Sequence, residues 1–142
     1  MDYRNYDDCK SNVKQLYKDQ RINQDLDFVK KCIKKYCSFT RKDKFIDLFE
    51  NLSLKDLSDP DLDCENYYHF YQTAEAIRKD GHPEWMQIVG LIHDFGKILY
   101  LKGCTEDGTC ENSQWGIVGD TFIVGCQIPD TIVFPEFNSL NS

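Results

Sequence analysis

Apolar residues in the first third of the chain recur at the three-to-four spacing of an amphipathic helix. The repeat is formed by Leu26, Val29, Ile33 and Tyr36. Residues at this spacing share one face of a helix, so they form a stripe that packs against the rest of a protein. The pattern predicts a helix over roughly Asp19 to Tyr36.

The middle of the chain has three further helical patterns. A shorter helix is predicted over Phe45 to Leu52, where apolar positions recur at the same spacing. The next pattern runs from about Asn66 to Lys79 and stops near Gly81. His82-Pro83 opens the last one, since proline is well tolerated in the first turn of a helix, and this helix continues into His93-Asp94.

The remaining segments have no helical period. We expect a turn at Ser58 to Asp61, because proline disfavours a helical residue before it, and a polar surface loop from Lys102 to Gln114. Short apolar runs in Trp115 to Gly125 fit either a strand pair or an ordered active-site loop. The tail from Pro129 onward is predicted to be irregular, with a frayed end at Asn138 to Ser142. The sequence therefore predicts an all-α fold with an irregular C-terminal loop region.

Composition and charge restrict the class of protein. The 142 residues, 41% of them hydrophobic, fit one domain over residues 1–142 with an ample core. The net charge of −7 argues against a nucleic-acid partner, because proteins that bind phosphate backbones need a basic face. Positive charge clusters between Lys30 and Lys44, which we interpret as a solvated helix face.

The sequence also predicts a cytoplasmic protein with reduced thiols. No segment approaches the ~18 consecutive apolar residues of a membrane span, so we expect no membrane partner. The N-terminal Met1 to Asp8 is polar and acidic, unlike a signal peptide. The seven cysteines are odd in number and include no Cys-x-x-Cys pair, which favours free thiols that serve mostly as small core hydrophobes. Cys104 and Cys110 bracket the polar loop and could pair if oxidised.

The candidate chemistry lies in His69, His93 and Asp94, which include two of the three histidines in the chain. Two antiparallel helices with a short connection would place His69 beside the other two. Two imidazoles and a carboxylate favour iron, manganese or another first-row divalent ion over calcium. Neighbouring helical residues diverge by about 100°, so we expect Asp94 to point away from His93 and toward a second metal. The alternative interpretation is a core histidine with an aspartate at a helix end.

Longer strings of sequence around these residues resemble those of a known protein family. The strings are Ser58 to Asp61, His69 to Glu75, Ile77 to Lys79, His93 to Lys97, and Gly119 to Phe122 with Val124 to Cys126. His69 followed by His93-Asp94 resembles the HD-domain metal signature, and the strings together resemble the myo-inositol oxygenase family. Arg4 to Tyr6 and Asp27 to Val29 also fit this family. The resemblance covers nearly the whole chain in order, with weak stretches at Phe39 to Leu57, at Lys102 to Gln114 and after Gln127.

The resemblance implies an HD-domain-like helical bundle with a non-haem di-iron centre. The family cleaves one carbon–carbon bond of myo-inositol with O2 and forms D-glucuronate, a step of inositol catabolism. His69 and His93 would ligate the first iron, and Asp94 would bridge both irons. Lys97 would stabilise negative charge on the bound substrate or on reduced oxygen. The alternative for Lys97 is an exposed lysine at a helix end.

The resemblance also implies a set of substrate contacts. They would be Arg4, Asp56, Leu57, Ser58, Lys97, Gly119 and Asp120. A polyol needs several short donors and acceptors that converge from loops, although Leu57 can contribute only its backbone. Asp56, Ser58 and Asp120 are also common cap and turn residues, which is the alternative interpretation of each. Glu75 and Asp59 either orient the ligating imidazoles or are solvated carboxylates.

The chain departs from the family in length and in ligand count. Family members are about twice as long, and their second half supplies two further histidines and an aspartate, whereas this chain has no histidine after His93. We therefore expect a truncated bundle that holds at most one ion well, and a fragment with little activity alone. Family members are expected to be monomers, but the uncovered apolar surface would allow association here.

Two other functions stay open. The first is a non-catalytic metal-binding or interaction module. The second is an HD phosphohydrolase, which is poorly supported because only Lys97, Arg78 and Lys79 offer positive charge near the motif.

Overall fold

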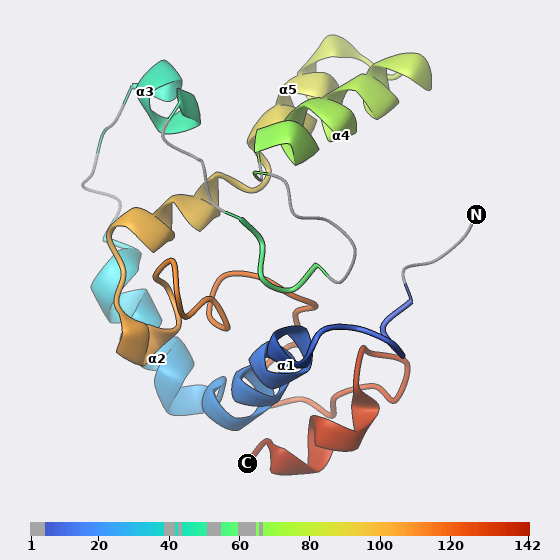
Figure 1. The fold of residues 1–142 in the computed structure, drawn as a ribbon. Coiled ribbons are helices and arrows are strands. Elements are labelled where there is room, and N and C mark those ends of the chain that lie inside the picture. The colour runs from blue at the N-terminus through green and yellow to red at the C-terminus, as the bar shows by residue number, and fades with distance from the viewer. Residues whose placement is uncertain (1–4, 39–41, 43, 51–54, 60–64, 66) are drawn as a thin grey trace.

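The computed structural model describes residues 5–38, 42, 44–50, 55–59, 65 and 67–142. Within these ranges the protein is mostly helical and has no β-strand, so the all-α prediction is confirmed. Trp115 to Gly125 is accordingly an ordered loop and not a strand pair. The helices are α1 (Ser11–Asn23), α2 (Leu26–Tyr36), α3 (Phe45–Glu50), α4 (Tyr67–Lys79) and α5 (Glu84–Ile92), with 3-10 helices η1 (Phe95–Leu101), η2 (Thr105–Asp107) and η3 (Pro135–Leu140) (Figure 1).

The predicted helix from Asp19 to Tyr36 is wrong in one respect, because the chain breaks it into α1 and α2. Asp25 has an extended backbone, and its carboxylate accepts the N–H of Phe28 at 2.7 Å. This bond caps the N-terminus of α2, as an aspartate before an apolar run commonly does. The apolar stripe of α2 is also largely uncovered within the described residues, where Leu26 and Ile33 are exposed.

One hydrophobic core lies in the lower part of Figure 1, between α1 and the loop that follows η2. Val13, Leu16 and Tyr17 of α1 pack against Trp115 and Val118. Such packing removes apolar area from water at about 25 cal/mol per Å².

The tail is tied to α1, so the predicted frayed end is wrong. Asn141 donates to the carbonyls of Arg21 and Gln24 at 2.8 and 3.1 Å, which satisfies acceptors at the end of α1. The buried Arg21 guanidinium in turn donates to the Val133 carbonyl at 3.1 Å and to Asn138. The tail also contains η3, which packs on α1.

The polar segment from Lys102 to Gln114 is more than a surface loop, which corrects the prediction. Asp107, Thr109 and Gln114 are buried. The Asp107 carboxylate pairs with Lys31 and Lys35 of α2 at 3.0 and 2.6 Å. The lysines of α2 therefore do not form a purely solvated face, because two of them neutralise a buried carboxylate.

Of the two predictions about the cysteines, one is confirmed and one is wrong. The six cysteines that the structure describes are free, as expected, but none of them is buried. The idea that most of them serve as core hydrophobes is therefore wrong. Cys64 lies outside the described residues.

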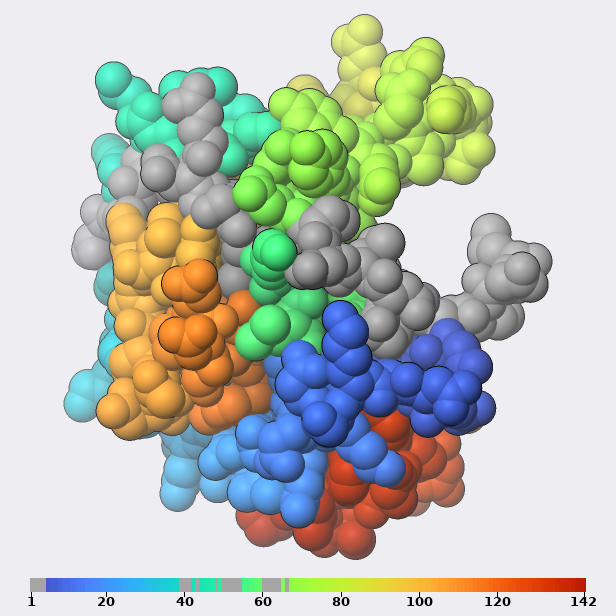
Figure 2. Space-filling view, in the orientation of Figure 1, coloured from blue at the N-terminus to red at the C-terminus, as the bar shows by residue number. Residues whose placement is uncertain are grey.

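Helices α4 and α5 pack together as a hairpin, which forms a lobe at the upper right in both views (Figures 1 and 2). An aromatic cluster joins it to α3 and η1, with Phe70 of α4 fully buried between Phe49 and Phe95. The ring centroids of Phe70 and Phe95 are 5.7 Å apart. None of the described helices is long and apolar enough to cross a membrane.

Candidate metal centre and adjoining pocket

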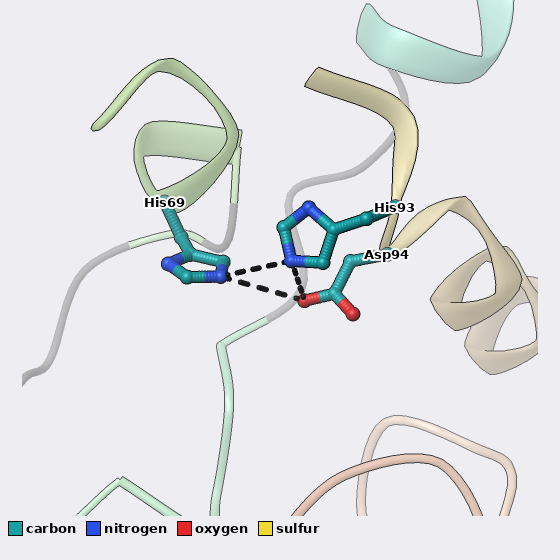
Figure 3. A group of neighbouring side chains, drawn as sticks. All are labelled: His69, His93 and Asp94. Carbon is teal, nitrogen blue, oxygen red and sulfur yellow. Dashed lines mark hydrogen bonds and ion pairs between the residues drawn. The ribbon is translucent and has the colours of Figure 1, made fainter. Parts of the chain in front are cut away.

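Three side chains from two neighbouring helices and the junction after them converge at one point. His69 belongs to α4, His93 is the residue that follows α5, and Asp94 precedes η1. The Nε2 atoms of His69 and His93 are 3.2 Å apart. Asp94 Oδ2 lies 3.7 Å from Nε2 of His69 and 3.4 Å from Nε2 of His93 (Figure 3). The predicted convergence of the three is confirmed, and their role as ligands stays a prediction at this point.

The expected divergence of His93 and Asp94 is wrong. Helix α5 ends at Ile92, and Asp94 has φ −99° and ψ 11°, outside the α-helical region. The 100° rule for helical neighbours therefore does not apply at this junction. The Asp94 carboxylate turns back toward the His93 ring and faces the same point. The second metal that Asp94 would bridge stays a prediction.

Packing and one hydrogen bond set the orientation of the imidazoles. The Nδ1 atom of His93 lies 2.7 Å from the carbonyl oxygen of Gly90, which can only accept, so Nδ1–H donates. This bond leaves the Nε2 lone pair of neutral His93 directed at the other two side chains, as in many metal-ligating histidines. His69 is placed by its neighbour Phe70, because burial of that ring fixes the rotation of α4 about its axis.

Gly90 also allows the two helices to approach closely enough for the side chains to meet. A Cβ at this position would lie 2.6 Å from Ile77 Cδ1 and 3.3 Å from the Ala74 backbone. Helices that approach this closely require small residues at the contact. The same residue thus provides the close contact and the acceptor for His93.

The three donor atoms fit a first-row divalent ion. A point equidistant from them, with separations of 3.2, 3.4 and 3.7 Å, lies about 2.0 Å from each atom. Bonds from imidazole and carboxylate to such ions are about 2.0–2.2 Å long. Two imidazole lone pairs at 3.2 Å also repel each other unless a cation or a proton lies between them. The side chains are 46%, 34% and 24% exposed for His69, His93 and Asp94, so an ion held by them would keep open positions.

Lys97 connects the three candidate ligands to the segment of residues 55–58. Its Nζ lies 2.9 Å from Asp94 Oδ2 and 3.0 Å from Asp56 Oδ2, and its side chain is 13% exposed. The alternative of an exposed lysine at a helix end is therefore wrong. Burial alone would lower the pKa of Lys97, but attraction to Asp56 and Asp94 outweighs it and raises the pKa. Lys97 is thus a held ammonium group at neutral pH.

Asp56 combines two roles. Its Oδ1 accepts the N–H and the Oγ–H of Ser58 at 2.9 and 2.5 Å, so the turn-forming interpretation of both residues is confirmed. Its Oδ2 faces Lys97. Burial would raise the pKa of Asp56, but Lys97 and the hydrogen bonds from Ser58 outweigh burial and lower it. The carboxylate is therefore ionised at neutral pH.

A cavity of about 320 Å³ lies beside the triad. Of the predicted contacts, its lining includes Asp56, Ser58, Lys97, Gly119 and Asp120. Sequence reasoning missed Tyr6, Tyr17, Glu65, Gln72, Ile117, Val118 and Thr121 in the same lining. Gln72 could have been found, because it lies one helical turn from His69 on the same face.

Three other predicted residues are not among the described residues that line the cavity. Arg4 is outside the described residues. Leu57 is not in the cavity lining, and its backbone N–H, the one donor it could offer, donates to Gln114 Oε1 at 3.1 Å. Glu75 pairs with Arg78 on the exposed face of α4, which supports a solvated carboxylate, whereas Asp59 lines the cavity.

Fold and site together define a helical protein with a candidate transition-metal centre beside a polar pocket. The family model described as myo-inositol oxygenase matches residues 10–142. The chain belongs to the myo-inositol oxygenase family.

Curated relatives agree with this assignment. The chain is 39% identical to an inositol oxygenase of Danio rerio over 139 residues, which are 94% of this chain and 47% of the relative. It is 40% identical to inositol oxygenase 1 of Arabidopsis thaliana over 141 residues, 95% of this chain and 44% of the relative. For the inositol oxygenase of Homo sapiens the identity is 41% over 124 residues, 83% of this chain and 40% of the relative. The chain thus spans less than half the length of these relatives.

Proposed function

We propose that this chain provides the metal-binding and substrate-binding residues of an inositol oxygenase that works in the cytoplasm in inositol catabolism. The reaction is the cleavage of one ring carbon–carbon bond of myo-inositol with O2, which gives D-glucuronate. The observation that supports it is the juxtaposition of His69, His93 and Asp94 with a polar cavity, in a chain of this family.

The proposed metal is iron, held by the two Nε2 atoms and by Asp94. When bound, iron supplies the redox chemistry that activates O2. The chain contributes the ligand geometry and an ammonium group, Lys97, held 2.9 Å from the ligating carboxylate. In this position Lys97 donates a hydrogen bond to a substrate oxygen and stabilises negative charge on it.

The proposed substrate site uses the cavity next to the metal ligands. Its volume of about 320 Å³ is at the small end of the range for small-molecule sites. A ring with six hydroxyl groups needs both acceptors and donors around it. Asp56, Asp120 and the hydroxyl oxygen of Ser58, whose O–H already donates to Asp56, supply acceptors, while Lys97 supplies donors.

We further propose that the 142-residue chain alone holds at most one ion and has little oxygenase activity. It contains three histidines, and His82 is not part of the candidate metal group. Three protein ligands can hold one ion whose remaining positions are filled by water. A di-iron centre needs ligands that these residues do not supply.

The test is an anaerobic titration of the purified chain with ferrous iron, followed by myo-inositol and then by O2. We expect about one iron per chain, myo-inositol binding that requires the metal, and little D-glucuronate. His69→Ala should abolish iron binding, whereas the matched variant His82→Ala should not. Failure of the wild-type chain to bind iron would contradict the proposed metal site. Two irons per chain, or rapid turnover, would contradict the limit on activity.

A non-catalytic interaction module is the second candidate. The observation that favours it is the exposed apolar face of α5, where Trp85 and Ile88 are 62% and 57% exposed. A helix that is apolar on most sides is normally covered. This candidate predicts concentration-dependent association in sedimentation experiments, which the change Trp85→Lys should prevent.

A phosphohydrolase is less well supported. The described lining of the cavity contains five carboxylates, those of Asp56, Asp59, Glu65, Asp94 and Asp120. Its one described lysine or arginine, Lys97, already contacts two of them. A phosphate group would be repelled by this charge balance.

A further inference from the structure

We propose that Gln114 is a positioning residue that holds both walls of the substrate pocket in place without contacting the substrate. This inference rests on the proposed function and adds a residue to it. Gln114 is buried, and it is absent from the residues that line the cavity. Any effect it has on substrate must therefore pass through the segments that it binds.

The side chain of Gln114 fixes the first wall, residues 55–58. Its Nε2 donates to the Lys55 carbonyl at 2.9 Å, and its Oε1 accepts the Leu57 N–H at 3.1 Å. These two bonds enclose Asp56, so the backbone on both sides of that carboxylate is held. Asp56 in turn orients Ser58 and pairs with Lys97. The clamp therefore sets where the acceptor and the donor of this wall lie.

The backbone of Gln114 fixes the second wall, residues 117–121. Its carbonyl accepts the N–H groups of Ile117 and Val118 at 2.9 and 3.1 Å, which forms the turn that leads to Gly119 and Asp120. The next residue, Trp115, is packed in the α1 core, and its carbonyl accepts from Gln24 at 2.6 Å. Gln114 thus connects the α1 core to two segments that line the pocket.

The three partners of the side chain require an amide in one orientation. Nε2 faces two carbonyl oxygens, of Lys55 and Glu111, while Oε1 faces an N–H group. A glutamate of the same shape would place a second oxygen against two carbonyls, and acceptors that face each other repel. A methionine of similar length would fill the space but leave the Leu57 N–H unpaired. Gln114→Glu and Gln114→Met therefore remove the clamp in two different ways.

The experiment compares these two variants with the wild-type chain and with Gln127→Glu, which makes the same chemical change at an exposed position. Amide hydrogen exchange of the metal-loaded chain reports on the clamp, and calorimetry reports on the affinities for ferrous iron and for myo-inositol. We expect exchange at residues 55–58 to become faster by at least about tenfold, and myo-inositol to bind about tenfold more weakly, since a net hydrogen bond is worth roughly that factor. Iron affinity should change less than about twofold, because the candidate ligands lie on α4 and at the junction between α5 and η1. Gln127→Glu should leave all three values unchanged.

Each outcome decides one part of the inference. Unchanged exchange at residues 55–58 in Gln114→Met overturns the clamp, even if Gln114→Glu fails to fold. Faster exchange with unchanged myo-inositol affinity overturns the role in substrate binding. Equal losses of iron and myo-inositol affinity would show that Gln114 merely stabilises the fold, which also overturns it. If the wild-type chain binds iron but no myo-inositol, the proposed function fails, and hydrogen exchange still tests the clamp on its own.

Discussion

Replacement of Gly90 by alanine tests the idea that close contact between α4 and α5 creates the metal site. The added Cβ would meet Ile77 Cδ1 at 2.6 Å and the Ala74 backbone at 3.3 Å. The Ile77 methyl group ends a side chain and can turn away. The Ala74 backbone belongs to a helix, so the second contact can be relieved only if the two helices separate.

The size of the effect follows from these distances. Carbon atoms in contact are about 3.5–4.0 Å apart, so the helices must separate by a few tenths of an ångström. Overpacking of this kind lowers the free energy of unfolding by about 1–3 kcal/mol. The better helix propensity of alanine offsets about 0.5–1 kcal/mol of this loss. The Nε2 atoms of His69 and His93 move apart in the same direction. This shift approaches the limit of about 0.5 Å within which ligands must be held, so we expect cobalt or ferrous ions to bind roughly tenfold more weakly.

The assay is a spectroscopic titration with cobalt, together with thermal unfolding of the metal-free chain. Gly96→Ala is the matched control, since a Cβ there would have no neighbour within 4 Å. The control should retain wild-type affinity. If Gly90→Ala retains it as well and unfolds cooperatively, close contact between the helices is not what sets the ligand distances.

Two further predictions concern charge. Lys97→Met leaves the carboxylates of Asp56 and Asp94 without their shared ammonium group. In urea unfolding of the metal-free chain, the free energy of unfolding should fall by about 2 kcal/mol, and a divalent ion should restore part of this loss. Equal stability with and without the lysine would refute this prediction. Asp107 has a pKa held well below its usual range by hydrogen bonds from Lys35 and from Tyr36 and Lys31, which outweigh burial. Its contribution to stability is complete above about pH 4, where the unfolded carboxyl is also ionised, and is lost as the pH falls further. Between about pH 6 and pH 3, the melting temperature of the wild-type chain should therefore fall more than that of Asp107→Asn.

The sequence predicted the helices and the convergence of the candidate ligands well where local pattern determines structure. The apolar spacing of α3, α4 and α5 and the proline before α5 gave their positions to within a few residues. The pairing of His69 with His93 followed from two helices joined by a short connection. The predicted direction of Asp94 failed, because it assumed that α5 continues, whereas the helix ends at Ile92. A single dihedral change at a helix end is not visible in an apolar pattern.

Polar burial could not be predicted from the sequence. Residues 102–114 read as a solvated loop because their side chains are polar, yet Asp107 and Gln114 are buried. Their partners are two lysines about 70 residues away for Asp107 and the backbone of residues 55–57 for Gln114. Buried polar groups need partners that are near in space and distant in sequence, and a local pattern carries no information on them.

The position of Lys97 links the two halves of the candidate site. One ammonium group contacts a carboxylate of the metal group and a carboxylate of the pocket wall, at 2.9 and 3.0 Å. Without an ion, this lysine is what neutralises Asp94, so the carboxylate can stay near the imidazoles instead of turning to water. Preorganisation of this kind lowers the cost of metal binding, because few groups must be ordered when the ion arrives. One side chain thus joins the candidate metal group to Asp56 of the cavity wall.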